Sequence, residues 1–471
     1  MTQTATHAAG DRYVLVGGMP RDYRREMVVV AAEGSWLTLA DGRRLLDLHG
    51  QHMCLAIGHR HPALVAALHQ AIDGVHYAAA DFLTHDARSA AARLLIEQTL
   101  EGRDHYGAVR FVCSGSEATE MALMLARLYT QRPVVVSRDL GFHGWTAGAA
   151  AATGVAWRRN ALIAPGQTQV RQVPGPHTPY PAAPAPLCAS CPLGRTYPAC
   201  RDAQGTLACV NATESVLRSV GVEQVAAFIT ELWHGAGAFL VPDEYPAQIR
   251  ALTQRLGVLW IDDEAIGGPA RTGSWWAFQN YGVRPDIVTM AKGISNAAVP
   301  VGACAVSPDI ASFVDGSWWT HSSTFSGHPL AAAAVVATLQ VILDEDLVQR
   351  AVRLGDAVSA RLAALAAAHA CVSGFTGRGL LWGLELVRDP RSGARWVPAD
   401  RRYSPATDGL PRMNPSRYVS AACAERGVLL VPYAPNTVTL APALTIGEGD
   451  LWHGIDVLDE CLTELDRRMG D

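Results

Sequence analysis

Lys292 is the only lysine in a chain of 471 residues that carries 39 lysine and arginine side chains in total. It lies just after the apolar run Ile287–Met290 and directly before Gly293. A lysine amine can attack a carbonyl to form an imine, whereas an arginine guanidinium stays protonated and cannot. A lone lysine is ordinarily a solvated surface group. Its retention in a chain that otherwise uses arginine nevertheless favours amine chemistry at this position.

Three acids, Asp262, Asp263 and Glu264, end the predicted strand Val258–Ile261. Ligands of open α/β sheets bind at the carboxyl ends of the strands. A buried carboxylate there could pair with a pyridinium nitrogen and keep a cofactor ring electron-withdrawing. A surface turn, a metal site or a phosphate site can show the same short pattern, so the acids alone do not decide between these interpretations.

Small polar residues follow another predicted strand, Val109–Cys113. Ser114, Gly115 and Ser116 precede a helical pattern that runs to about Leu128. Small side chains let a phosphate approach the free N–H groups and the positive dipole of a helix N-terminus. A strand–helix turn capped by serine, without any ligand, has the same sequence pattern.

Two further segments carry candidate cofactor contacts. Phe142 and His143 follow the predicted strand Pro133–Ser137, and a flat aromatic side chain there can stack on a cofactor ring. Thr324 lies in a polar, glycine-containing stretch before a helix and offers another phosphate donor. The alternatives are a core phenylalanine, a hydrogen-bonded core histidine and an ordinary loop.

Four cysteines fall within 22 residues, at Cys188, Cys191, Cys200 and Cys209. This spacing could hold a structural zinc ion or an iron–sulfur cluster. The alternative is an insertion with buried thiols or a disulfide. In either case we expect a structural role and not a catalytic one.

The elements that position these residues form an alternating pattern. From about residue 85 to residue 330, short apolar runs alternate with amphipathic helical segments. This predicts an α/β domain whose mainly parallel sheet is covered on both faces. Its predicted strands are Val109–Cys113, Pro133–Ser137, Val225–Leu232, Val258–Ile261, Ile287–Met290 and Gly302–Val306.

The two ends of the chain predict a smaller α+β domain. Residues 1–60 read as short strands that join it, and residues 331–471 supply the rest. Residues 61–330 form the large domain, with an irregular, cysteine-containing insertion at about 167–210. The elements predicted in these flanks are strands Met27–Ala31, Trp36–Leu39 and Arg44–Leu48, with a hairpin at Asp41-Gly42, and helices Pro62–Ile72 and Leu330–Leu343.

Composition narrows the class of protein. Charged residues make up 18% of the chain and the net charge is −5, which gives no sign of a nucleic-acid or anionic-membrane partner. No apolar stretch has the length of a membrane span, and the first residues lack the apolar core of a signal peptide. We therefore expect a cytoplasmic protein with reduced thiols.

Taken in order, these segments resemble the class III (ω-type) aminotransferases, a family of fold-type I pyridoxal phosphate enzymes. The resemblance extends from about Leu48 to Leu462. Its most specific part is the segment Asp263–Gly273, DEAIGGPARTG, which is similar to the family pattern D-E-V-x-x-G-x-G-R-T-G. Lys292 follows 29 residues after Asp263.

The resemblance implies a role for each candidate residue. Lys292 becomes the Schiff-base lysine and proton carrier, and Asp263 pairs with the pyridine nitrogen. The other implied cofactor contacts are Ser114, Gly115 and Ser116 at the phosphate, Phe142, His143, Glu231 and Ala265 around the ring, and Thr324 at the phosphate of the neighbouring subunit. The implied architecture is a seven-stranded, mainly parallel sheet domain with a small α+β domain, assembled as a homodimer with shared active sites.

Several positions depart from the family pattern. Many members use a glutamate–arginine pair to accept both an amine and glutamate. Ala236 stands where that glutamate is expected, and Thr439 where the arginine is expected. The joint loss avoids an unpaired buried charge and puts glutamate as an amino donor in doubt. Ile266 and His328 replace a glutamine and an asparagine of the pattern.

The resemblance implies an aminotransferase. It would move an amino group between a primary amine, such as an ω-amino compound or an amino sugar, and a carbonyl compound or 2-oxo acid. An isomerase on the same scaffold (a racemase, epimerase or aminomutase) is the alternative, because it needs no second substrate. A cofactor-binding regulatory protein without turnover is a third interpretation.

Overall fold

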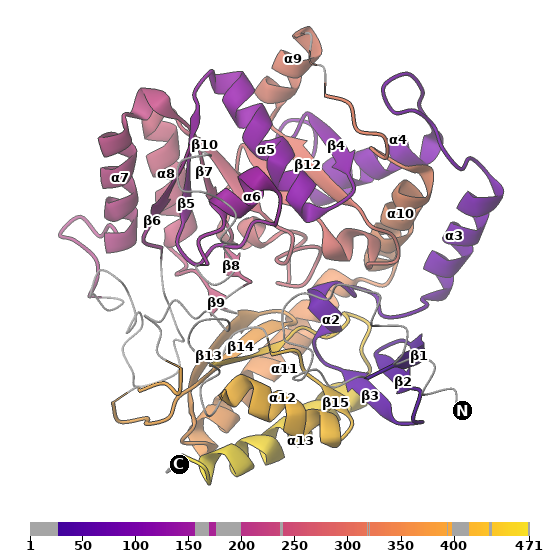
Figure 1. Cartoon of the computed structure of the whole chain (residues 1–471), viewed down its shortest axis with the longest axis vertical. Coiled ribbons are helices and arrows are strands. Elements are labelled where there is room, and N and C mark those ends of the chain that lie inside the picture. The colour runs from indigo at the N-terminus through magenta and orange to yellow at the C-terminus, as the bar shows by residue number, and fades with distance from the viewer. Residues whose placement is uncertain are drawn as a thin grey trace.

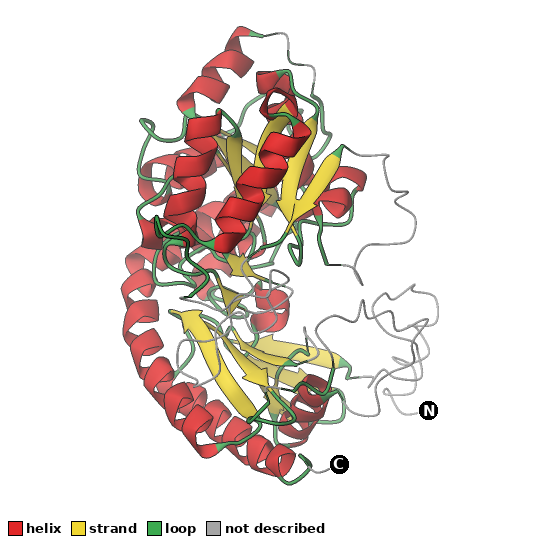
Figure 2. Cartoon of the chain, turned by 90° about the vertical axis from the view of Figure 1, so that its left-hand side faces the viewer, coloured by secondary structure: helices red, strands yellow, loops and turns green. Residues whose placement is uncertain are grey.

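The computed structural model of the chain forms two bodies, which lie one above the other in Figure 1. The larger body holds a sheet with helices on both sides, and the smaller one holds short sheets against long helices (Figure 2). The residues described by the structure are 27–155, 169–175, 199–235, 239–317, 319, 321–392, 394–397, 414–432 and 436–469.

A seven-stranded sheet in the order β4-β12-β11-β10-β7-β5-β6 forms the centre of the larger body. β12 runs antiparallel to both of its neighbours, and the other adjacent pairs are parallel. This confirms the expected fold class, an α/β protein with a mainly parallel sheet. The strands are β4 (Ala108–Val112), β5 (Val134–Arg138), β6 (Val170–Val173), β7 (Val225–Thr230), β10 (Leu259–Asp263), β11 (Ile287–Met290) and β12 (Gly302–Val306).

The central strands of the sheet are buried because most of their residues are apolar. Every residue of β7, β11 and β12 is buried, as expected for strands covered on both faces. The helices of this body are α3 (Pro62–Asp73), α4 (Asp86–Arg93), α5 (Gly115–Thr130), α6 (Ala147–Ala152), α7 (Ala208–Val220), α8 (Tyr245–Leu256), α9 (Pro308–Gly316) and α10 (Pro329–Asp344). A π-helical turn, Leu94–Thr99, continues α4, and 3-10 turns cover Val222–Gln224, Ala277–Tyr281 and Lys292–Ser295.

The smaller body joins the two ends of the chain. The amino-terminal strands and β15 form one sheet, β1-β2-β3-β15, in which Val428 of β15 lies opposite Leu46 of β3. A second sheet has the order β13-β14-β16. The elements are β1 (Val29–Glu33), β2 (Trp36–Leu39), β3 (Arg44–Asp47), α11 (Leu347–Ala368), β13 (Val372–Arg378), β14 (Leu381–Leu386), α12 (Pro415–Glu425), β15 (Val428–Leu429), β16 (Thr437–Leu440) and α13 (Glu448–Asp466).

A short turn and a short ribbon lie between the two bodies in Figure 1. The turn is α2 (Gly50–Met53), whose interior backbone is not helical. The ribbon pairs β8 (Trp233–His234) with β9 (Phe239–Leu240). Neither was predicted, because both are too short to show an apolar period.

The strand predictions hold to within one or two residues, with two corrections. β10 extends to Asp263, so Asp262 and Asp263 lie inside the strand and not after it. β6 forms within the segment that was expected to be irregular. It is a short edge strand with only one fully buried residue, so its sequence carries a weak signal.

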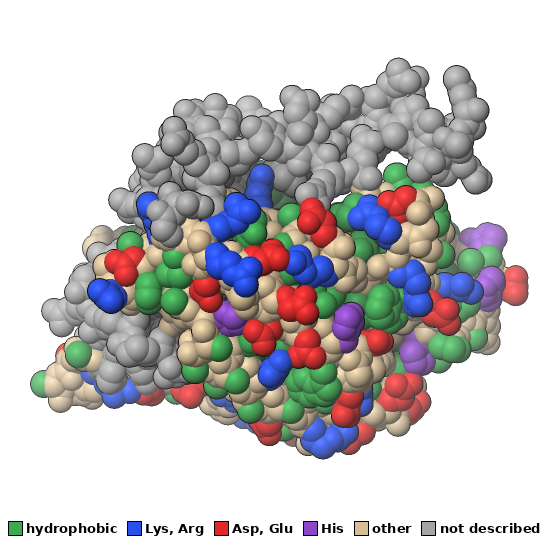
Figure 3. Space-filling view, turned by 90° about the horizontal axis from the view of Figure 1, so that it is seen from below, with side chains coloured by type: hydrophobic (Ala, Val, Ile, Leu, Met, Phe, Trp, Pro, Cys, Tyr) green, Lys and Arg blue, Asp and Glu red, His purple; other side chains and the backbone are tan. Residues whose placement is uncertain are grey.

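The face of the smaller body seen from below carries both signs of charge (Figure 3). Arginine side chains alternate there with aspartate and glutamate side chains, and no large single-sign field forms among the side chains that are described. Within the described ranges, no helix is long and apolar enough to cross a membrane.

Candidate active site

Asp263 is held by three donors at the carboxyl end of β10. Its Oδ1 accepts hydrogen bonds from the Thr289 hydroxyl at 3.0 Å and from the Ala265 N–H at 3.2 Å. Its Oδ2 lies 2.9 Å from Nδ1 of His143. Because a carboxylate oxygen accepts, we assign the N–H of His143 to Nδ1, which donates this hydrogen bond. Each carboxylate oxygen accepts about two hydrogen bonds, so Oδ1 is saturated and Oδ2 can take one more donor.

Thr289 is a residue that the sequence analysis missed. It is buried in β11 beside β10, where Asp263 and Thr289 are direct neighbours in the register. The available signal was a single hydroxyl in the otherwise apolar strand Ile287–Met290. A buried hydroxyl needs a partner, and Asp263 is the residue opposite Thr289 in this strand pair.

Glu231 lies one residue past β7 and is buried. Its carboxylate accepts the Phe142 N–H at 2.6 Å and the Gly235 N–H at 2.9 Å. Burial raises the pKa of Glu231, and the charge of Asp263 raises it further, whereas His143 lowers it. Glu231 therefore holds two backbone segments in place, one at Phe142 and one at Gly235.

The start of α5 faces the same region. The Ser114 hydroxyl caps the helix by accepting the Glu117 N–H at 3.2 Å, and the first N–H groups of a helix have no partner inside it. A Cβ added at Gly115 would lie 3.1 Å from the Cβ of Ala291 and 4.0 Å from that of Ala265. Gly115 thus brings the helix N-terminus against the residue before Lys292 and against the residue two positions after Asp263.

Ser116 connects this helix start to the loop that carries Phe142. Its hydroxyl accepts the Trp145 N–H at 3.1 Å, and a Cβ added at Gly144 would lie 2.5 Å from that oxygen. The Phe142 and Trp145 rings meet edge to face at 5.7 Å. The predicted phosphate and stacking segments are therefore adjacent, although 26 residues separate Ser116 from Phe142.

Lys292 begins a 3-10 turn directly after the carboxyl end of β11. Its φ is 50°, the left-handed region that costs a residue with a Cβ of the order of 1 kcal/mol. The side chain is half-buried. A strained backbone at the single lysine is typical of a position where surrounding structure fixes a functional side chain.

Asp262 and Glu264 point away from Asp263, on the other side of the strand. Asp262 accepts a hydrogen bond from the Thr230 hydroxyl at 3.3 Å, and Glu264 accepts the Phe278 N–H at 3.0 Å. Burial raises the pKa of both, that of Glu264 to about 7. The charge of the neighbouring Glu264 carboxyl raises the pKa of Asp262 further.

Thr324 does not join this group within one subunit. It is exposed on a turn whose neighbour Ser326 donates a hydrogen bond to the Phe111 carbonyl at 2.7 Å. In the described part of the chain, no hydrogen bond connects Thr324 to the residues around Asp263. Its predicted contact with the phosphate bound by a neighbouring subunit remains a prediction.

Two of the four clustered cysteines lie within the described residues. Cys188 and Cys191 lie outside the described residues, whereas Cys200 and Cys209 are buried. Among the described residues, no three His, Cys, Asp or Glu side chains are placed to hold a metal ion. Of the two departures in the glutamate–arginine pair, Ala236 also lies outside the described residues, and Thr439 is buried in β16.

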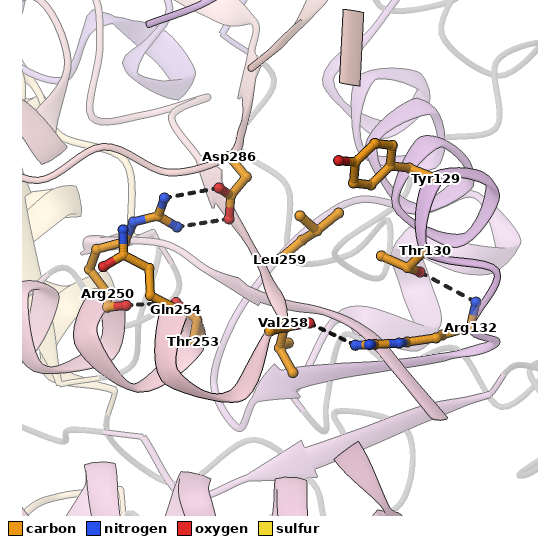
Figure 4. Close-up of a pocket in the computed structure, with 10 residues that line it drawn as sticks. Tyr129, Thr130, Arg132, Arg250, Thr253, Gln254, Val258, Leu259 and Asp286 are labelled. Atoms are coloured by element: carbon orange, nitrogen blue, oxygen red, sulfur yellow. Dashed lines mark hydrogen bonds and ion pairs between the residues drawn. The ribbon is translucent and has the colours of Figure 1, made fainter. Parts of the chain in front are cut away.

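A surface pocket of about 330 Å³ lies at the opposite edge of the sheet (Figure 4). It is lined by residues at the amino ends of β10 and β11, including Leu259 and Asp286. Arg250 forms a double ion pair with Asp286, and Arg132 donates to the carbonyls of Val225 and Gly257. The charged groups of Arg250, Asp286 and Arg132 already have partners, so these three side chains offer no unpaired charge to a ligand.

The residues at the carboxyl edge fit pyridoxal phosphate. This cofactor has an aldehyde, an aromatic pyridine ring and a phosphate. The site places one amine, Lys292, near a carboxylate with a free acceptor site, Asp263 Oδ2, an aromatic side chain, Phe142, and the N-terminus of a 16-residue helix. Each chemical part of the cofactor has a matching group.

Residues 19–462 match the family model described as Aminotransferase class-III. The chain belongs to the class III aminotransferases. It is 33% identical over 442 residues to the uncharacterized aminotransferase YhxA of Bacillus subtilis, which covers 90% of this chain and 89% of that protein. It is 30% identical over 472 residues to the acetylornithine aminotransferase of Mycobacterium bovis, which covers both chains fully.

A solved S-selective transaminase from Arthrobacter sp. has the same fold. It superposes with a TM-score of 0.90 at 36% identity, over 99% of both chains. A leucine/methionine racemase of Thermococcus litoralis is also similar, at 26% identity over 94% of this chain. The class III aminotransferase is thus a pyridoxal phosphate-dependent enzyme of fold type I, and this likeness extends over nearly its whole length.

Proposed function

We propose that this enzyme transfers the amino group of a primary amine with an apolar substituent to a 2-oxo acid or another carbonyl compound. The observation that carries the proposal is a buried apolar cluster beside the site. Ile266 follows directly after Ala265, and Trp233 lies two residues after Glu231. Both pack in a cluster of side chains from the two bodies: Met53, Trp233, Leu240, Ile266, Leu381 and Ala441.

An apolar cluster favours an ω-amino compound or arylalkyl amine over an amino sugar, because sugar hydroxyls would lose their hydrogen bonds there. Thr439 supports the same conclusion, since a buried hydroxyl replaces the positive charge that would bind the second carboxylate of glutamate. The similar Arthrobacter transaminase has also been solved with alanine bound. We therefore propose alanine and pyruvate as the donor–acceptor pair that completes the cycle.

The roles of the protein residues follow from their positions. Pyridoxal phosphate, when bound, supplies an electron sink for the carbon that carries the amino group. Lys292 binds the cofactor covalently and moves a proton at that carbon. The Asp263 carboxylate would hold the proton of the pyridine nitrogen. Phe142 would pack against the ring, and the N-terminus of α5 would bind the phosphate.

The test is a donor screen with pyruvate as the acceptor. Purified enzyme is incubated with 1-phenylethylamine, an aliphatic ω-amino acid or glutamate, and alanine formation is measured. We expect turnover with the arylalkyl amine and little with glutamate. Lys292→Ala should lose activity by about 1,000-fold or more and lose the visible absorbance of lysine-bound cofactor. Turnover with glutamate alone, or retention of that absorbance, would contradict the proposal.

An isomerase is the second candidate, favoured by the similar racemase. In deuterated water an isomerase places deuterium in an otherwise unchanged amino compound and needs no acceptor. A transaminase instead converts its bound cofactor stoichiometrically to the amine form when the acceptor is left out. Mass spectrometry of the amine and the absorbance of the enzyme separate the two reactions in one sample.

We also propose a homodimer. Large apolar side chains are exposed next to the turn of Thr324, namely Phe82, Leu83 and Phe325. The His85 ring and the Gly327 carbonyl, 2.7 Å apart, join the two segments that carry them. Exposed apolar groups gathered on one surface are typical of a subunit interface. A second copy placed there would bring Thr324 toward the partner's site.

A cytoplasmic location is part of the proposal. The described cysteines Cys54, Cys113, Cys304, Cys371, Cys423 and Cys461 are free thiols, the state favoured in a reducing compartment. A structural metal at the four clustered cysteines stays a prediction that metal analysis of the purified protein would test.

A further inference from the structure

We propose that Arg271 and Asn296 are positioning residues that hold residues 50–58 against the lysine and so fix one side of the apolar cluster that we assign to the amine. The proposal rests on the proposed function, because it concerns how this enzyme accepts its amine. Both side chains come from the larger body. The segment that they hold leads out of the smaller body, and the two anchors bind it at adjacent points.

The held segment begins in a strained turn. Gly50, Gln51 and Met53 have φ values of 57°, 60° and 59°, which is unfavourable for the two residues with side chains. The buried Asp47 carboxylate stabilises the turn by accepting the His49 N–H at 2.9 Å and two donors of Gln51 at 3.0 Å. Strain of this kind persists only where the surroundings over-determine the backbone.

Arg271 is the first anchor. Its guanidinium is fully buried and donates to the carbonyls of Ala441 at 3.0 Å, Pro442 at 2.9 Å and Leu55 at 2.9 Å. Burial lowers the pKa of Arg271 to about 10, so the group is still a cation at neutral pH. One side chain therefore connects three segments: its own loop, the amino-terminal segment and the chain after β16.

Gly50 shows how closely the first anchor is packed. A Cβ added there would lie 2.8 Å from the Ala441 carbonyl oxygen and 3.1 Å from an Arg271 Nη. The turn is therefore closely packed against the Arg271 guanidinium and against the Ala441 carbonyl oxygen that accepts its hydrogen bond. A movement of Arg271 would release the turn.

Asn296 is the second anchor, four residues after Lys292. Its Oδ1 accepts the Ile57 N–H at 2.8 Å, and its Nδ2 donates to the Gly58 carbonyl at 2.7 Å. The residue is buried and has a φ of 53°, a conformation that asparagine tolerates better than most residues. The lysine turn and residues 57–58 are thus joined by two hydrogen bonds from one amide.

The residues at and between the two anchors lie beside the lysine. A Cβ added at Gly293, next to Lys292, would lie 3.6 Å from the Cβ of Ala56. The Cys54 thiol lies near both the Lys292 and the Arg271 side chains. Met53 packs in the apolar cluster that we assign to the amine. Loss of either anchor should therefore loosen this segment without removing a group that touches the cofactor.

The experiment compares Arg271→Lys and Asn296→Asp with a matched control, Arg132→Lys. Arg132 also donates to two backbone carbonyls, but at the far edge of the sheet. We expect the KM for the amine to rise about tenfold in both anchor variants. A rise of this size corresponds to the loss of one hydrogen bond that contributes slightly more than about 1 kcal/mol. The value of kcat and the visible absorbance of the bound cofactor should change little. The control should keep its KM.

A second measurement does not depend on turnover. Iodoacetamide labelling of the holoenzyme, followed by peptide mass spectrometry, gives the alkylation rate of Cys54 relative to Cys113, the other partly exposed free thiol in the described part of the chain. We expect the ratio to rise several-fold in the two anchor variants and to stay constant in Arg132→Lys. Because Arg271→Lys keeps the positive charge, we expect this variant to fold.

The outcomes separate the two proposals. If the wild-type enzyme transfers no amino group from any amine, the proposed function fails, and the Cys54 ratio still tests the anchors. If the ratio and KM are the same in all variants, the positioning role is wrong although the function stands. A fall in kcat and in cofactor binding with an unchanged KM would also overturn it, because the anchors would then act on the cofactor.

Discussion

The three adjacent acids of β10 have different environments because a strand alternates its faces. Asp263 faces the site and is held by Thr289, His143 and the Ala265 N–H. Asp262 and Glu264 face the core on the opposite side of the strand. One acid is thus prepared to hold a cation, and burial raises the pKa of the other two and so favours their uncharged forms.

Removal of the hydroxyl that orients Asp263 should weaken the reaction without removing the cofactor. Thr289→Val keeps the shape and deletes one donor to Oδ1. We expect kcat/KM to fall about tenfold, the effect of one hydrogen bond to a charged group. Thr338→Val is the control, because that buried hydroxyl of α10 makes no hydrogen bond with any described residue. Equal losses in both variants would show that Thr289 acts only through packing.

The buried carboxyl of Glu264 predicts a pH dependence of stability. Burial raises its pKa from the usual 4.5 to about 7 in the fold. The folded state therefore binds more protons than the unfolded state between these values, and the free energy of unfolding falls as pH rises from about 4.5 through about 7. The loss is about 3 kcal/mol at 1.4 kcal/mol per pKa unit.

Glu264→Gln tests this dependence by urea unfolding at several pH values. The amide cannot ionise and keeps an acceptor for the Phe278 N–H, so the slope between pH 5 and pH 8 should become shallower. Glu97→Gln, a change at an exposed acid, should leave the slope unaltered. A slope that is the same in all three proteins would contradict the raised pKa of Glu264.

At the scale of elements, the site forms where strand ends and one helix N-terminus meet. β10 and β11 are parallel, so Asp263 and the turn of Lys292 lie at the same edge of the sheet. β12, which runs the other way, begins at that edge, and its first residue is Gly302. A Cβ at Gly302 would lie only 2.2 Å from the Ser114 carbonyl oxygen.

The contact at Gly302 predicts a site-specific effect of a single methyl group. In Gly302→Ala the added Cβ must displace backbone at the start of α5. We expect a stability loss of about 1–3 kcal/mol and weaker binding of pyridoxal phosphate, by about tenfold. Gly316→Ala, in α9, is the control, since a Cβ there meets no atom within 4 Å. Unchanged cofactor affinity in Gly302→Ala would show that α5 does not bind the phosphate.

In the molecule as a whole, the apolar cluster assigned to the amine and the proposed subunit interface both depend on segments distant in sequence. The apolar cluster draws side chains from residues 53 to 441, and the exposed apolar surface joins Phe82 to Phe325. The first set lies where the two bodies meet. The second is exposed in a single chain, which is why we assign it to an interface between copies.

A charge on that surface should separate the subunits. Phe82→Glu places a carboxylate where the side chain is 88% exposed in one chain, so folding should be unaffected. In a dimer the charge would be buried and would cost several kcal/mol. Sedimentation velocity should then show the mass of one chain, with loss of activity. Val30→Glu, at an exposed position of β1, should remain dimeric; a dimeric Phe82→Glu would contradict this interface.

The sequence and its family resemblance were enough to predict the cofactor and most of the fold. The single lysine, the acid at a strand end and the glycine–serine start of a helix are local patterns, and the apolar runs predicted six of the seven strands of the large sheet. Local patterns carry this information because side-chain period and turn residues act over a few positions. Thr289, in contrast, became visible only through strand pairing.

The tertiary structure was needed to show that β12 runs antiparallel to its neighbours and how the segment beside Lys292 is held. Arg271 and Asn296 bind backbone groups up to 239 residues away. Backbone carbonyls and N–H groups are the same at every position, so no residue type in the sequence indicates such partners. The lysine was evident from composition, whereas the segment packed against it was fixed by long-range packing.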